Sequence, residues 1–174
     1  MPGPAILQLV RNLAGDTGTP AVFSDTELAG VCARYRRHWR YLLLTPLPTY
    51  RPGQQVVYEE GVAPVRFWDP DSVQAYGPDW SPFPLARIEA EEGRFVYAQP
   101  TVLPVFVSGD SYDVYGAAAE VCERWAARLA TTAIDTSADG VTVQASGAVR
   151  QLAERARVLR AQADALVVPV VLRG

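Results

Sequence analysis

The sequence predicts a mainly α (α+β) protein: an antiparallel helical bundle of about four helices, with a β-rich insertion between helices two and three and an extended C-terminal tail. Apolar residues recur at alternating steps of three and four through the last third of the chain, as in amphipathic helices. Prolines and glycines separate short β-prone runs in the middle. We therefore expect a helical domain formed by residues 1–42 and 108–166, an insertion at 43–107 and a tail at 167–174.

Two helices are expected before the insertion. The first is Pro4–Ala14, because proline suits the first turn of a helix and a glycine follows the segment. The second is expected over Asp25–Tyr41. It begins with a capping box, in which the side chains of Ser24 and Glu27 each bond the backbone of the other.

The end of this second helix carries the most basic patch of the chain. On a helix, Arg34, Arg37 and Arg40 would fall on one side at a spacing of three. Two interpretations remain open. The patch is either a solvated face that pairs with acidic neighbours, or a contact for a polyanion.

The insertion reads as a small antiparallel β unit. Glu91–Gly93 lies between two alternating runs and is typical of a hairpin turn. The β-prone runs are Gln55–Tyr58, Val65–Trp68, Ala86–Glu89, Arg94–Ala98 and Val102–Val107.

Two long helices are expected after the insertion, Ser111–Thr132 and Ser146–Leu166, with Asp110 or Ser111 capping the first. Their apolar stripes are Tyr115, Ala118, Cys122, Trp125 and Leu129 in one, and Val149, Leu152, Ala156, Leu159, Ala163 and Leu166 in the other. Each stripe needs a surface against which to be buried, and alanines allow backbones to approach closely. We expect the two helices to pack on each other.

The chain offers little that resembles a catalytic or metal centre. Its single histidine, His38, stands between Arg37 and Trp39 without a nucleophile or second ligand. The loop at 135–140 has the alternating acidic pattern of a calcium loop, but Ser146 stands where a bidentate glutamate is required. The two cysteines form no CxxC motif, so they indicate buried thiols. We expect no enzymatic activity, no metal and no cofactor.

Composition and terminal sequence limit the remaining classes. The formal net charge is −3, which argues against a protein whose whole surface grips phosphates. The N-terminus has neither the basic nor the apolar region of a signal peptide. No stretch approaches the roughly 18 consecutive apolar residues of a membrane span. We expect a protein of the cytoplasm, or of a particle assembled there.

Four segments, taken in order, point to a family. They are Phe23–Leu28 (FSDTEL), Tyr112–Ala119 (YDVYGAAA), Trp125–Ala130 (WAARLA) and Asp135–Gly140 (DTSADG). Together they resemble the head–tail connector, or adaptor, family of long-tailed bacteriophages and gene-transfer particles. After Gly140 the chain departs from that family: it has Val-Thr-Val-Gln-Ala-Ser where members often carry a Ser-x-x-x-Ser-Gln-like run.

The resemblance implies a structural virion protein. Its subunits would form a ring, commonly dodecameric, that docks on the portal and connects the DNA-filled capsid to a stopper or tail protein. DNA would pass through the channel without sequence-specific binding, and no membrane would be involved. The protein would occupy the neck of the virion, and the host cytoplasm during assembly.

The resemblance also assigns candidate residues. The portal contact would be made by the tail residues Val167, Val168, Pro169, Val170, Val171, Leu172 and Arg173. Contacts between subunits would be made by Arg34, Arg37, Arg40, Arg150 and Arg157.

Two alternative functions are compatible with the sequence. The first is a tail-completion or stopper protein of a phage neck, which would bind a tail tube. The second, from a different class, is a carbohydrate- or nucleotide-binding module, because the aromatic residues between Trp68 and Trp80 have the composition of a stacking platform. Packing inside the domain is the other explanation of those aromatic residues.

Overall fold

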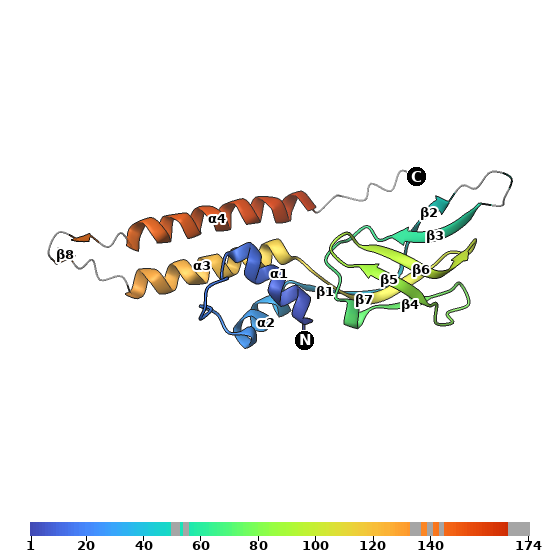
Figure 1. Cartoon of the computed structure of the whole chain (residues 1–174), viewed down its shortest axis with the longest axis horizontal. Helices are drawn as coiled ribbons and strands as arrows, with labels where there is room; N and C mark the ends of the chain where they lie inside the picture. The colour runs from blue at the N-terminus through green and yellow to red at the C-terminus, as the bar shows by residue number, and fades with distance from the viewer. Residues whose placement is uncertain (50–52, 54–55, 133–136, 139–140, 143–144, 167–174) are drawn as a thin grey trace. The chain divides into compact units, whose positions relative to one another are not determined.

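The computed structural model describes residues 1–49, 53, 56–132, 137–138, 141–142 and 145–166 (Figure 1). The chain forms two compact units, which we call the helical unit and the sheet unit. The helical unit contains Met1, Leu7–Tyr35 and the chain from Asp113 onward. The sheet unit contains Pro2–Ile6 and Arg36–Tyr112.

The fold class expected from the sequence is wrong. The protein is not a helical bundle with an insertion but an α+β fold, in which seven strands in two antiparallel sheets lie between the second and third helices. Strands make up a third of the residues. The four helices are α1 (Pro4–Ala14), α2 (Asp25–Arg34), α3 (Val114–Thr132) and α4 (Ala145–Leu166).

The largest error concerns the second helix. α2 ends at Arg34, where the N–H of Tyr35 donates to the carbonyl of Cys32, and the next residues form strand β1 (Arg36–Leu43). β1 pairs antiparallel with β7 (Phe106–Tyr112), so these residues find backbone partners far along the chain. Arg37 and Arg40 therefore lie on a strand and share no helix face with Arg34.

The same pairing moves the start of the third helix. Residues up to Tyr112 belong to β7, so neither Asp110 nor Ser111 caps α3. Asp113 does so instead: its side-chain Oδ1 accepts a hydrogen bond from the N–H of Gly116 at 2.8 Å. The capping box of α2 is confirmed, with Ser24 and Glu27 bonded reciprocally.

The two sheets share no strand. One has the order β1-β7-β4, with β4 at Gln74–Tyr76. The other has the order β2-β3-β6-β5. Its strands are β2 (Thr45–Thr49), β3 (Val57–Val62), β6 (Arg94–Thr101) and β5 (Leu85–Glu89). A 3₁₀ turn, η1 (Pro70–Ser72), and a short hairpin of β8 (Ser137–Ala138) and β9 (Val141–Thr142) complete the elements. The expected strand at Val65–Trp68 is absent; Trp68 forms only an isolated bridge to Ser111.

The core of the sheet unit is aromatic. Trp68 and Phe95 are fully buried and meet edge to face, with ring centroids 5.5 Å apart. The expected hairpin turn is confirmed, because Gly93 lies between β5 and β6 with φ +70°. The core of the sheet unit therefore combines side chains from segments that are far apart in the sequence.

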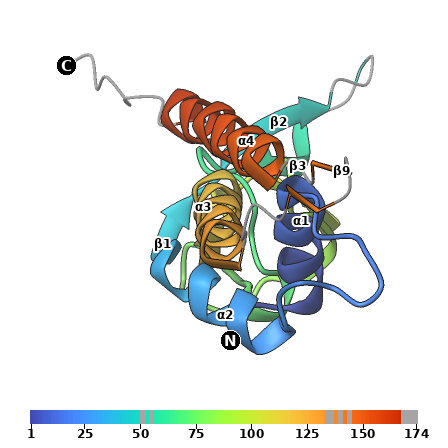
Figure 2. The ribbon, with the colours of Figure 1, turned by 90° about the vertical axis from the view of Figure 1, so that its left-hand side faces the viewer.

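The core of the helical unit combines large side chains, among them Phe23 and Leu28, with alanines at the contact between α3 and α4. α3 and α4 lie side by side, as the end-on view in Figure 2 shows. Ala117, Ala118 and Ala119 of α3 are buried, and so are Ala156 and Leu159 of α4. The expected packing of these two helices on each other is confirmed, although Cys122 and Trp125 of the α3 stripe contact Ala14 and Phe23 instead. Alanine lets the helix axes approach closely, which suits a pair held along much of its length.

Candidate interaction surfaces

The single histidine lies on β1 beside an acidic partner. His38 Nδ1 is 2.7 Å from Asp110 Oδ1, and Arg36 is 3.6 Å from the other oxygen of the same carboxylate. Asp110 stands opposite His38 in the register of β1 and β7, so strand pairing explains the contact. Sequence reasoning missed Asp110 because it placed His38 on a helix.

The two cysteines have the properties of structural residues. Cys32 and Cys122 are free and buried, as expected. Burial raises the pKa of the Cys32 thiol to about 11 and also raises the pKa of Cys122. Within the described residues, no group of three or more His, Cys, Asp or Glu side chains could hold a metal ion. No helix in that part of the chain is long and apolar enough to cross a membrane.

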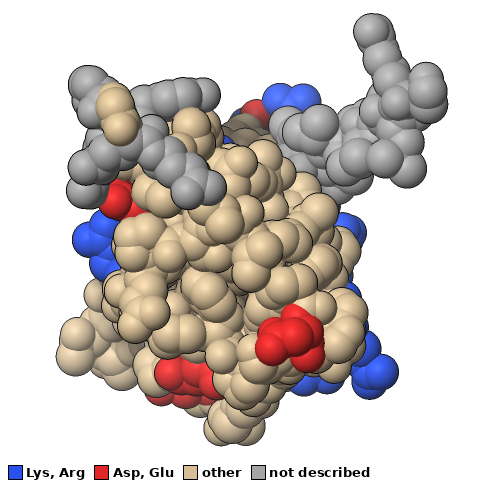
Figure 3. Space-filling model, turned by 90° about the vertical axis from the view of Figure 1, so that its right-hand side faces the viewer, with Lys and Arg blue, Asp and Glu red and all other residues tan. Residues whose placement is uncertain are grey.

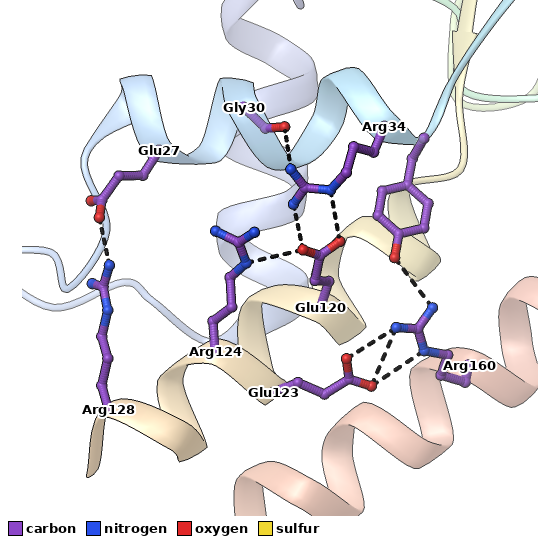
Figure 4. Close-up of polar contacts among 9 residues, drawn as sticks. Glu27, Gly30, Arg34, Glu120, Glu123, Arg124, Arg128 and Arg160 are labelled. Carbon is purple, nitrogen blue, oxygen red and sulfur yellow. Dashed lines mark hydrogen bonds and ion pairs between the residues drawn. The ribbon is translucent and has the colours of Figure 1, made fainter. Parts of the chain in front are cut away.

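Ion pairs tie α2 to α3 on the helical unit (Figure 4). Arg34 of α2 forks onto the carboxylate of Glu120, which also accepts from Nε of Arg124 at 2.9 Å. One turn away, Arg128 of α3 donates to Glu27 of α2 at 2.5 Å. These pairs link α2 to α3 at two positions along the helices.

A second set ties α4 into the same unit (Figure 4). Arg160 of α4 donates to Glu123 of α3 at 3.0 Å and to the hydroxyl of Tyr35 at 3.2 Å. Arg155 donates from Nε to the carbonyl of Leu13 at 2.9 Å. Arg160 thus joins residues from two elements to α4, and its charge is used inside the subunit.

The expected inter-subunit arginines fall into separate places. Arg34 has a partner in its own chain, Glu120, and Arg157 pairs with Glu154 on its own helix at 2.8 Å. Arg150 is exposed on α4. Arg37 and Arg40 are exposed on β1, and neither forms an ion pair with another described residue. The five arginines thus lie on α2, β1 and α4, and their contact with a neighbouring subunit stays a prediction.

Glu27 provides a test of the helical network by pH. Hydrogen bonds from the Ser24 backbone and from Arg128 lower the pKa of Glu27 from 4.5 to about 2. A depressed carboxylate pKa adds stability above pH 4.5, and that stability is lost as the pH falls toward 2. We expect Glu27→Gln to lower the urea midpoint of unfolding at pH 7, with a difference from the parent that shrinks below pH 4.5. A difference that is constant from pH 7 to pH 2.5 would contradict this account.

The sheet unit carries an exposed aromatic cluster, which we define as Tyr41, Tyr76, Trp80 and Phe106. The ring of Tyr41 lies 5.3 Å from that of Tyr76 and 4.7 Å from that of Trp80. Trp80 lies 5.1 Å from Phe106. Tyr41 is 50% exposed and Trp80 is 54% exposed, although both belong to residue types that favour burial. The aromatic cluster is therefore a candidate binding surface.

The backbone holds two members of this cluster in an unusual conformation. Tyr41 has φ +50° and Trp80 has φ +64°, in the left-handed region that disfavours side chains. Tyr41 lies in a bulge of β1, where its N–H donates to Ser108 Oγ at 3.0 Å. The N–H of Trp80 closes a turn onto the carbonyl of Gly77 at 3.1 Å. Such conformations concentrate at functional sites.

The sequence suggested a stacking platform between Trp68 and Trp80, but these two tryptophans lie in different environments. Trp68 is fully buried and donates from Nε1 to the carbonyl of Val65 at 3.0 Å, so it belongs to the core. Trp80 alone of the two tryptophans reaches solvent. The expected portal contact, Val167–Arg173, lies outside the described residues.

The comparisons with known proteins add no family. No family model, no curated protein and no solved structure matches the chain.

Proposed function

We propose that this chain is a subunit of a head-to-tail adaptor: a non-enzymatic virion protein that assembles as a ring on a portal and connects a DNA-filled capsid to a stopper or tail protein. The ring is proposed to be dodecameric, with DNA passing through its channel without sequence-specific contacts. The neck of a virion is its proposed location, after assembly in the host cytoplasm.

The observation that carries the proposal is where the family-like segments lie in the fold. Phe23–Leu28 contains the capping box that starts α2. Tyr112–Ala119 contains Asp113, which caps α3, and the three alanines buried beneath it. Trp125 packs edge to face on Phe23, with centroids 6.5 Å apart, so two of these segments meet. Three of the four resembling segments thus contribute caps or packing to the helical unit, and Asp135–Gly140 lies mostly outside the described residues.

The larger sheet content does not weaken this support, because the resemblance concerns the helical segments. α4 already buries Ala156 and Leu159 within the described residues, and the apolar run Val167–Leu172 follows it. An apolar terminal run is a liability in water unless something covers it. A portal subunit is the cover that the proposal assigns.

The test mixes the purified protein with the portal ring of the same virus and examines the mixture by electron microscopy. We expect rings stacked on the portal. A variant with Val167–Leu172 replaced by six serines should keep its thermal unfolding midpoint and lose at least tenfold in portal affinity. Val158→Ser, an exposed apolar residue of α4, is the matched control and should bind normally.

Two outcomes would contradict the adaptor. One is failure to bind the portal under conditions in which the control portal ring is intact. The other is binding to a tail tube with none to the portal, which would make the chain a stopper or tail-completion protein. Unfolding of the serine variant would show that the terminal run belongs to the core of its own subunit.

A further inference from the structure

The aromatic cluster includes a row of apolar side chains that crosses the three-stranded sheet. Leu43 of β1, Phe106 of β7 and Tyr76 of β4 stand in register across the three-stranded sheet, and Leu43 is exposed. Tyr41 and Trp80 lie beside this row. Figure 3 shows one end of the sheet unit, on which charged side chains are few. Exposed apolar faces of this kind mark interaction sites.

Tyr41 and Trp80 have a strained, left-handed backbone conformation. Glycine at position 41 or 80 would relieve the left-handed strain and also remove an exposed aromatic ring from water. The native residues keep the strained backbone at both positions, and their rings contact each other, Tyr76 and Phe106. Such a pair of residues is expected where the rings are needed in place for a partner.

The chain itself contains a segment whose chemistry fits this face. Apart from Met1, the described residues of the helical unit expose only two large apolar side chains, Val22 and Val158. The run Val167–Leu172 consists of four valines, a proline and a leucine. Pro169 has no N–H to donate to a sheet edge, so the run offers a partner mainly its apolar side chains.

Charge also matches at one end. Arg173 follows the apolar run directly, and Asp79 precedes Trp80 in the cluster. Asp79 is exposed and accepts hydrogen bonds from the Ser81 hydroxyl at 2.7 Å and the Ser81 N–H at 3.2 Å. These bonds lower the pKa of Asp79 and keep it ionised at neutral pH. An acidic group at the border of an uncharged face suits a basic residue at the border of an uncharged segment.

We propose that the aromatic cluster binds the segment Val167–Leu172 of a second copy of this chain, with Arg173 paired to Asp79. Each copy then offers one cluster and one segment, which is a head-to-tail contact. Contacts of this kind generate rings when the rotation between copies closes. The inference does not require a portal. One segment cannot occupy a cluster and a portal together, so an added portal should release it, and either proposal can fail alone.

The test is sedimentation velocity of the full-length protein from 1 to 300 µM. We expect association that rises with concentration. Trp80→Gly and Tyr41→Gly should each weaken it at least tenfold, with circular dichroism showing that each variant is folded at the temperature of the measurement. The double variant Val170→Asp with Val171→Asp should weaken association as much. Val158→Asp, which alters an apolar residue outside the cluster, should associate normally.

Mixing variants separates a head-to-tail contact from other arrangements. Trp80→Gly keeps its segment and the Val170→Asp, Val171→Asp variant keeps its cluster, so an equimolar mixture should recover association that neither shows alone. Failure to recover, as expected if two copies meet through the same face, would overturn the proposal. So would a parent protein that stays monomeric throughout, or association that the cluster variants leave unchanged.

Discussion

Replacing Gly93 with alanine is expected to destabilise the fold by about 3 kcal/mol, a large share of a typical total. Gly93 forms the turn between β5 and β6 with φ +70°, a conformation that costs a side chain about 1 kcal/mol. A Cβ there would lie 2.2 Å from the carbonyl oxygen of Val65. That oxygen belongs to the backbone and cannot rotate away. The carbonyl of Gly93 also accepts from Ala63 at 2.8 Å, so the turn cannot shift freely.

Gly53 is the matched control for this substitution. It has φ +74°, close to that of Gly93, but a Cβ there would meet nothing within 4 Å. Gly53→Ala should therefore show the conformational strain alone, about 1 kcal/mol. The free energy of unfolding of both variants, measured in urea by circular dichroism, separates strain from collision. Equal losses for the two would show that contact with Val65 has no part in the stability of the turn.

Local signals in the sequence were sufficient for some elements. The capping box at Ser24 and Glu27 placed the start of α2, and Pro4–Ala14 is the helix that the sequence predicts. The turn at Gly93 was found because its glycine lies between two alternating runs. In these cases the interactions that determine the structure lie within a few residues of one another.

Other features depend on partners far along the chain. Helical spacing continues past Arg34, but β7 supplies a backbone partner that fixes Arg36–Leu43 as a strand. The same holds for the candidate surfaces. Glu120 lies opposite Arg34 only once α2 and α3 have packed, so the arginine looked free in the sequence. The aromatic cluster draws on three separate segments, and no spacing in the sequence joins Tyr41 to Trp80.

Asp16→Ala is expected to destabilise the protein by about 3 kcal/mol, because it removes one member of a buried ion pair. Asp16 is 1% exposed and lies 2.7 Å from Arg11 of α1, whose side chain is itself largely buried. The same carboxylate accepts hydrogen bonds from the N–H groups of Val22 at 2.7 Å and Phe23 at 3.1 Å. The loop that leads into α2 is therefore held to the end of α1 by one side chain.

The substitution would leave the charge of Arg11 and the N–H groups of Val22 and Phe23 without this acceptor. Buried polar groups that lack a partner are costly, which accounts for the size of the loss. Arg11 also contacts Asp25 at 2.8 Å, but that carboxylate is 77% exposed. Asp25→Ala is thus the control. It removes an exposed carboxylate that pairs with the same arginine, and it should change the free energy of unfolding by less than about 0.5 kcal/mol. If both variants lose the same free energy of unfolding in urea, the stabilisation comes from ion pairing with Arg11 and not from the hydrogen bonds that buried Asp16 accepts.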